Sequence, residues 1–275
     1  MTGSNHRDTA TAAGGRGRQW PLILAATGFN LLFECSWRGV DSVSQTPLLF
    51  VALFLLYVTL FTILEDLVVE FRLRDYHLII AAFFYGTIYE FFGSGALFYQ
   101  PGFLGINWMT LFFANLVLWG SLQGIFTFYL ANRVAPRAPR ARLLTNRRWA
   151  LALLLNFIAL WWIRTDAKIP APGTVQWIVL VAILVLAAYL LNTVIQKREW
   201  RTAYIPFKKS MILDLVGIIT VVIFVISALF LTDHQVLPYI AIYDTAAWRV
   251  DLVWVSAVAI ILLVYRVLKG EAIPV

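Results

Sequence analysis

Residues 47–64 read PLLFVALFLLYVTLFTIL, eighteen consecutive positions without a charged side chain. The apolar run continues to Val69 and is interrupted only by Glu65 and Asp66. At 1.5 Å per residue, a helix of about 20 residues crosses the hydrocarbon core of a bilayer, which is about 30 Å thick. A strand of a membrane barrel would instead alternate apolar and polar residues over about ten positions. The stretch therefore predicts a transmembrane helix over residues 47–69.

The rest of the chain shares this apolar character. Of its 275 residues, 61% are hydrophobic and 13% are charged, whereas a soluble domain averages about 45–50% apolar and about 25% charged residues. A bilayer must therefore be the solvent for most of the chain. Only helices and closed barrels cross a bilayer, because every backbone N–H and C=O there needs a hydrogen-bond partner. We predict an all-α, polytopic helical membrane protein.

Eight apolar segments can be marked along the sequence. The predicted spans cover residues 20–37, 47–69, 78–99, 107–131, 149–165, 174–196, 210–232 and 248–267. Residues 1–18 are predicted to be a disordered cytoplasmic tail, residues 19–269 a single transmembrane domain, and residues 270–275 a short cytoplasmic tail. The start resembles a signal peptide, but no small-residue cleavage site follows, so we expect the first span to be retained.

The basic residues predict the orientation of these spans. With the N-terminus in the cytoplasm, 18 of the 22 lysines and arginines lie on the inner side, and only Arg38, Arg164, Lys168 and Arg249 lie outside. Basic residues concentrate in cytoplasmic loops of membrane proteins. Both termini are therefore predicted to be cytoplasmic, in a multi-pass protein of the cell membrane. The net charge of +7 then reflects loops that face an anionic leaflet and not a nucleic-acid partner.

The longest connection contains six arginines between Arg133 and Arg148. Such a loop can bind anionic lipid headgroups. The alternative is that these arginines only fix the orientation of the neighbouring spans.

The chain lacks residues that several classes of membrane protein need. All five lysines lie at span ends or in loops, which excludes a mid-span Schiff base, and none of the three histidines lies deep enough to bind a haem. The sequence has no HExxH motif and no Walker motif. Its single cysteine, Cys35, allows no internal disulfide. We therefore predict no metal and no cofactor.

Glu90 is the strongest candidate for a functional residue. It lies about 12 residues into the third span, about 18 Å from its inner end, and no basic residue lies three or four positions away. An ionisable residue inside a membrane costs at least about 2.5–3.5 kcal/mol and is by default a functional hypothesis. Glu90 is thus a candidate proton or cation site, or a catalytic acid. The alternative is a structural hydrogen bond to a neighbouring helix.

Glu34 lies at a similar predicted depth in the first span. Two carboxylates at one level can share a proton or bind a cation. The alternative is an ion pair with Arg38, which lies four residues further along the same helix. The sequence does not show whether the first and third spans are neighbours.

Asn30, Asn115 and Asp251 are candidates for a polar pocket around these acids. The alternative for the two asparagines is a hydrogen bond between helices. The alternative for Asp251 is a carboxylate at the start of the last span, where the helix dipole favours a negative charge. Glu65 and Asp66, near the inner end of the second span, are predicted to be a paired or solvated helix end, with an inner gate as the alternative.

Three functions remain open from the sequence. The first is a transporter of a small or lipophilic solute, coupled to protons or cations through an intramembrane carboxylate. The second is an intramembrane enzyme that acts on a lipid or isoprenoid by acid catalysis. The third is a non-catalytic membrane subunit whose acids only join helices.

Overall fold

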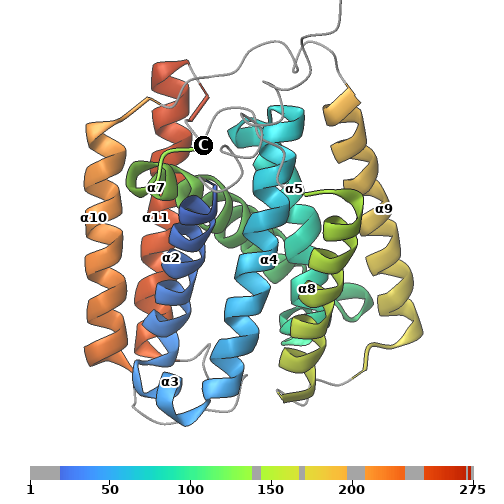
Figure 1. Cartoon of the computed structure of the whole chain (residues 1–275). Helices are drawn as coiled ribbons and strands as arrows, with labels where there is room; N and C mark the ends of the chain where they lie inside the picture. Colours follow the sequence, from blue (N-terminus) through green and yellow to red (C-terminus); the bar gives the residue numbers. More distant parts are fainter. Residues whose placement is uncertain are drawn as a thin grey trace, which may run out of the picture.

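The computed structural model describes residues 19–137, 144–166, 171–196, 208–232, 245–270 and 272–273. All regular elements in these ranges are helices, as Figure 1 shows. The predicted tail of residues 1–18 lies outside the described residues.

Eight long helical segments in the described ranges overlap the eight predicted spans one by one. They are α2 (Trp20–Arg38), α4 (Pro47–Phe71), α5 (Asp75–Ile88) continued by η1 (Tyr89–Gly93), α6 (Trp108–Phe113) continued by η4 (Ala114–Phe126) and α7 (Thr127–Val134), α8 (Asn146–Asp166), α9 (Thr174–Gln196), α10 (Met211–Ile226) continued by η6 (Ser227–Leu231), and α11 (Ala246–Lys269). The elements η1, η4 and η6 are π-helical. Short helices between the long segments are α3 (Asp41–Gln45), η2 (Ala96–Phe98) and η3 (Phe103–Gly105).

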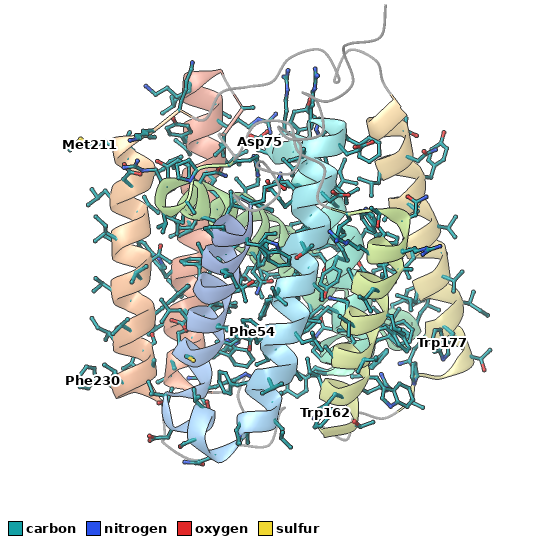
Figure 2. The ribbon with its side chains drawn as sticks, in the orientation of Figure 1. Phe54, Asp75, Trp162, Trp177, Met211 and Phe230 are labelled. Atoms are coloured by element: carbon teal, nitrogen blue, oxygen red, sulfur yellow. The ribbon has the colours of Figure 1, made fainter. Side chains whose placement is uncertain are left out.

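Five helices in the described part of the chain are long and apolar enough to cross a membrane. They cover Pro47–Phe71, Trp108–Val134, Thr174–Thr193, Met211–Leu231 and Ala246–Lys269. Their outward faces carry exposed aliphatic residues such as Val185, Ile218 and Leu263, each more than 60% exposed. Figure 2 shows such side chains pointing away from α9 and α10 along their whole length. A surface of this kind is compatible with acyl chains and not with water.

The helices form one bundle, in which one long segment runs obliquely to its neighbours. The pairs α4 with α8, α4 with α2, and α5 with α9 pack against each other, and α10 and α11 pack on α2. The continuous helix α6–η4–α7 runs obliquely behind α2 and α4 in Figure 1 and packs on α5, α2 and α11. This oblique helix therefore brings residues from several long segments close to one another.

The third predicted span ends earlier than expected. The continuous helix α5–η1 stops at Gly93, and Gly95 adopts a φ of 63°, the left-handed conformation that favours glycine and ends a helix. Residues 94–107 then fold back, and the backbone N–H of Asn107 donates to the carbonyl of Leu97 at 2.8 Å. The prediction extended to residue 99 because residues 96–99 are apolar. Leu97 is buried in a cluster of side chains. The apolar character of this segment therefore reflects packing inside the protein and not a continuing helix.

The acids at the end of the bundle where α4 ends and α10 begins are paired. Arg137 Nε lies 2.7 Å from a carboxylate oxygen of Glu65, and Arg133 Nε lies 2.7 Å from one of Asp214. Asp66 accepts hydrogen bonds from a backbone N–H and from a tryptophan indole. These contacts match a paired helix end.

Candidate functional site

Glu90 lies in the π-helical turn η1, and only 6% of the residue is exposed. Ser94, one turn further along, donates its hydroxyl hydrogen to one carboxylate oxygen. The indole Nε1 of Trp119, on η4, donates to the other oxygen at 3.0 Å. Single-turn π-helices are frequent at functional sites. Glu90 is thus held by two neutral donors from two different segments.

Trp119 is positioned by the close approach of η4 to α5. A Cβ atom on Gly86 would lie 2.6 Å from the Cδ1 atom of Trp119 and 2.2 Å from the side-chain oxygen of Asn115 on η4. A glycine is therefore required there. The rings of Tyr85 and Tyr89 lie 5.2 Å and 4.7 Å from the indole ring. The position of the indole beside Glu90 therefore depends on a missing side chain and on two tyrosine rings.

Glu34 is held in a different way on α2. Arg38 Nε donates to one carboxylate oxygen at 2.9 Å, which confirms the ion pair that the i,i+4 spacing predicts. The Tyr57 hydroxyl on α4 donates to the other oxygen at 2.5 Å. Gln123 Nε2 on η4 donates in turn to the Tyr57 hydroxyl at 3.3 Å. Glu34 therefore has a cationic partner and a supporting chain of hydrogen bonds from two other helices.

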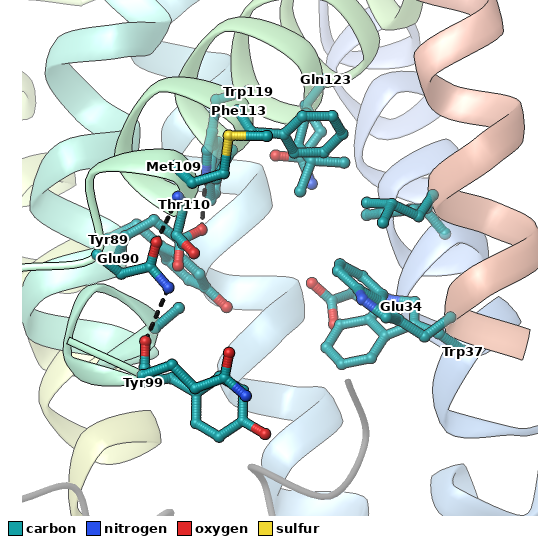
Figure 3. Close-up of a pocket in the computed structure, with 18 of the residues that line it drawn as sticks. Glu34, Trp37, Tyr89, Glu90, Tyr99, Met109, Thr110, Phe113, Trp119 and Gln123 are labelled. Atoms are coloured by element: carbon teal, nitrogen blue, oxygen red, sulfur yellow. Dashed lines mark hydrogen bonds between the residues drawn. The ribbon is translucent and has the colours of Figure 1, made fainter. Parts of the chain in front are cut away.

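A cavity of about 350 Å³ lies between the two carboxylates. Glu34 and Glu90 line opposite walls of it, as Figure 3 shows. Much of the remaining wall is aromatic and includes Phe33, Trp37, Tyr57, Tyr89, Phe113 and Trp119. The structure thus places both predicted acids on one cavity without a direct bond between them.

The cavity reaches the surface along the segment that follows Gly93. Gln100 and Met109 line its rim, and Met109 is 76% exposed. Gln100 has a φ of 47°, a strained conformation for a residue with a side chain. Asn107 fixes this rim because its Nδ2 donates to the carbonyl of Tyr99 at 2.8 Å and its Oδ1 accepts the backbone N–H of Thr110, in the first turn of α6, at 2.9 Å.

The two amide candidates lie outside the lining of this cavity. Asn30 Nδ2 donates to the Thr127 hydroxyl at 3.2 Å, which joins α2 to α7. Asn115 Nδ2 donates to the Thr87 hydroxyl at 3.0 Å, which joins η4 to α5. Both contacts are hydrogen bonds between helices, the alternative that the sequence left open.

Asp251 also lies outside the cavity lining and is fully buried. Its two carboxylate oxygens accept hydrogen bonds from Ser36 at 2.5 Å and from Ser227 at 2.8 Å. The carboxylate therefore joins α2, η6 and α11. The neighbouring positions Trp248 and Leu252 on α11 do line the cavity.

Sequence reasoning missed several residues that complete the site. Ser94 carried a signal, because its hydroxyl at i+4 from Glu90 is a hydrogen-bond donor. Gln123 carried a signal because it is an amide inside an apolar run. Tyr57 and Trp119 carried no signal in a chain with eleven tyrosines and eleven tryptophans.

Within the described ranges, no group of three or more histidine, cysteine, aspartate or glutamate side chains lies close enough to hold a metal ion. Comparisons with known proteins add no assignment: no protein-family model, curated protein or solved structure matches this chain. The functional argument therefore depends on the geometry of the cavity.

Proposed function

We propose that this chain is a multi-pass protein of the cell membrane that transports a small or lipophilic solute, coupled to protons or cations through Glu90. In this proposal, all eight long helical segments cross the bilayer and both termini are cytoplasmic. Five apolar helices and their exposed aliphatic faces support membrane insertion. The concentration of basic residues in one set of loops supports the orientation.

The cavity then opens toward the outside at Gln100 and Met109. Further along the helices toward the cytoplasm, beyond Tyr57, the rings of Phe61 and Phe128 are fully buried and meet edge to face at 5.6 Å. A cavity open on one side and closed by packed residues on the other fits one of the two states that alternating access requires.

The observation that carries the proposal is the environment of Glu90. Its carboxylate faces an aromatic cavity, and among the described residues only Ser94 and Trp119 form hydrogen bonds with it. An ionised carboxylate in a low-dielectric site is costly unless it is paired, so it takes up a proton or a cation. A group that changes charge as access alternates can couple a solute to a proton.

Transport can be tested with the full chain in liposomes that contain a pH-sensitive dye. A panel of lipophilic cations, anions and neutral solutes is added outside. We expect at least one solute to drive proton movement, and Glu90→Gln to slow it by about tenfold or more. Glu70→Gln, which alters an exposed carboxylate at the end of α4, is the matched control and should behave like the parent. A folded parent that moves no protons with any solute contradicts the proposal.

An intramembrane enzyme is the second candidate. A buried carboxylic acid in an aromatic cavity is also suited to protonating a lipid or isoprenoid, because aromatic rings stabilise cationic intermediates. The parent and Glu90→Gln can be incubated with membrane lipid and isoprenoid extracts and the products compared by mass spectrometry. A product formed by the parent alone would favour the enzyme over the transporter.

A non-catalytic subunit is the third candidate. Asn30, Asn115 and Asp251 already act as contacts between helices, and Glu90 would then be another. In that case Glu90→Gln lowers the yield of folded protein, and the parent neither moves protons nor turns over lipid.

We also propose that the Arg133–Arg148 connection binds anionic lipid headgroups. Arg133 and Arg137 are engaged with carboxylates, whereas Arg147 and Arg148 are exposed at the start of α8. The remaining two arginines of the connection lie outside the described residues. We expect Arg147→Gln with Arg148→Gln to weaken binding to vesicles rich in anionic lipid, and unchanged binding would contradict this role.

A further inference from the structure

The described lining of the cavity between Glu34 and Glu90 has no cationic side chain that could balance an ionised Glu90. Glu34 and Arg38 form an ion pair, so their charges cancel. Among the described residues that line the cavity, none is a lysine, an arginine or a histidine. When Glu90 is ionised, the cavity therefore has one negative charge that no residue of its lining neutralises.

The walls of the cavity are suited to a cation. Eight of the nineteen residues that line it are aromatic, and Trp119 and Tyr89 lie directly beside Glu90. The negative faces of aromatic rings attract organic cations, and tryptophan does so most strongly. An anionic solute would be repelled by Glu90, and a neutral solute would leave the carboxylate without a counter-ion.

The size and rim of the cavity narrow the class of solute further. A volume of about 350 Å³ is near the lower end of ligand pockets, which span about 300–1,000 Å³. The rim consists of neutral residues such as Gln100, Asn107 and Thr110. The cavity therefore suits a compact cation with one ring or a few short alkyl groups.

We propose that the solute is a small organic ammonium ion and that it exchanges with a proton on Glu90. This inference rests on the proposed transport function and names its substrate class. In the exchange, the O–H bond of the Glu90 carboxyl breaks, the proton passes to water at the open rim, and the ammonium ion takes its place without a covalent bond. One positive charge replaces another, so the buried carboxylate is neutralised throughout. Because both cations use the same carboxylate, only one of them is bound at a time.

We infer that Glu90, and not one of the other charged or titratable groups around it, supplies the proton for this exchange. These other groups are Glu34 with Arg38 and Tyr57 across the cavity, Tyr85 on α5, Tyr89 and Tyr99 on the adjoining segment, and Arg164 on α8. Arg164 donates to the carbonyls of Phe91 and Phe92 at 3.3 Å and 3.2 Å. Glu34 already has a cationic partner, because Arg38 Nε lies 2.9 Å from one of its carboxylate oxygens. The proton that an ammonium ion displaces is therefore that of Glu90.

The test compares two probes of the same shape with the purified full chain in detergent. Phenyltrimethylammonium carries a positive nitrogen where tert-butylbenzene has a carbon atom. The fluorescence of the cavity tryptophans, among them Trp37, Trp119 and Trp248, reports binding of both. We expect the cation to bind about tenfold or more tightly than the neutral probe at pH 8, and its affinity to fall as the pH is lowered. Equal or tighter binding of the neutral probe, or no binding of the cation, overturns the inference.

Proton release provides a second readout that needs no variant. Calorimetry in two buffers with different heats of ionisation counts the protons released as the cation binds. We expect release to approach one proton per cation in the acidic part of the range from pH 5 to 9. Binding without proton release at every pH in this range overturns the exchange.

Two variants then assign the effect to Glu90. Glu90→Gln should lose about tenfold or more of the affinity for the cation and keep that for the neutral probe, whereas Glu90→Asp should keep both. Cation binding that survives in Glu90→Gln overturns the assignment. If neutral or anionic solutes drive proton movement in the liposomes instead, the ammonium inference fails and the transport proposal stands. If the ammonium ion binds with proton release but is not transported, the transport proposal fails and the binding site stands.

Discussion

The two walls of the cavity hold the same type of side chain with different partners. Glu34 lies in the regular helix α2, where the i,i+4 spacing supplies Arg38 as a partner at 2.9 Å. Glu90 lies in the π-helical turn η1, where the residue at i+4 is Ser94, and its second donor is the indole of Trp119. Burial is almost the same, with 3% and 6% of the residues exposed.

The difference teaches that pairing, and not depth, decides which carboxylate can change its charge. A buried carboxylate beside a guanidinium is stable as an ion, because both charges are satisfied by the same contact. A buried carboxylate with neutral donors is stable only with a proton or an external cation. In the proposed exchange the Glu34 wall is therefore fixed, and the Glu90 wall is the one that responds to proton concentration and to ligands.

The largest loss of stability is expected from removing Arg38, the cationic partner of Glu34. Arg38→Met leaves Glu34 buried without its partner, and breaking a buried pair in this way costs about 3 kcal/mol of stability. Thermal unfolding of the purified protein measures the loss. Adding Glu34→Gln should restore much of it, because no uncompensated charge then remains. An Arg38→Met protein as stable as the parent would show that the two walls do not differ in the way proposed.

A smaller loss of stability is expected from displacing Trp119, which donates a hydrogen bond to Glu90. Gly86→Ala places a methyl group 2.6 Å from the Trp119 ring and 2.2 Å from the Asn115 side chain, and such overpacking costs about 1–3 kcal/mol. It should also weaken cation binding, because the indole beside Glu90 is displaced. Gly28→Ala on α2 is the matched control, since no atom lies within 4 Å of the added methyl group. The control should be neutral or stabilising, by up to about 1 kcal/mol.

A still smaller change in stability is expected from Glu90→Gln. The amide keeps an oxygen that can accept the Trp119 hydrogen bond and has nearly the same volume, so the cost should stay at about 1 kcal/mol or less. Thermal unfolding of parent and variant at neutral pH measures it. A loss comparable to that of Arg38→Met would mean that Glu90 is a structural contact, which favours the non-catalytic subunit.

Much of the helical arrangement could be predicted from the sequence, because a span is encoded in the length of its apolar run. The runs from residue 47 and from residue 248 correspond to α4 and α11 within a few residues. The end of the third helix at Gly93 was missed because hydropathy does not distinguish a helix from an apolar turn that packs inside the protein, although Gly93 and Gly95 are a helix-stop signal. The π-helical form of η4 was missed for the same reason.

The acids of the site could be found, but most of their partners could not. Glu90 and Glu34 stood out because charges are rare in apolar runs, and Arg38 followed from helical spacing. Trp119 lies 29 positions from Glu90, and Tyr57 lies 23 positions from Glu34. Such pairs depend on which helices are neighbours, and the hydropathy of one sequence contains no record of that packing.

At neutral pH the smallest effect is expected from changing His77, which lies in the first turn of α5 and does not line the cavity. Its variant separates the acid sensitivity of that end of the bundle from any pH response of the cavity. His77 is buried just before residue 78, where the third predicted span begins, and its Nδ1 accepts the backbone N–H of Arg74 at 2.8 Å. Burial first, and then the charges of Arg74 and Arg266, lower the pKa of His77 from 6.5 to about 4. Between these two values the unfolded chain binds more protons than the folded protein, so the contribution to stability is complete above about pH 6.5 and decreases as the pH falls toward about 4.

His77→Gln should remove this part of the acid sensitivity, because a glutamine at the third helical position can accept the same backbone N–H and does not titrate. Unfolding temperatures of parent and variant between pH 7.5 and 4.5 measure the effect, and the two curves should converge above about pH 6.5. The proposed exchange adds a second pH-dependent contribution to stability, because in it Glu90 binds and releases a proton in the folded protein. The double variant with Glu90→Gln should therefore differ from His77→Gln alone in how its stability changes with pH. If the two curves are parallel instead, Glu90 does not exchange a proton in the folded protein, and the two walls of the cavity are equally fixed.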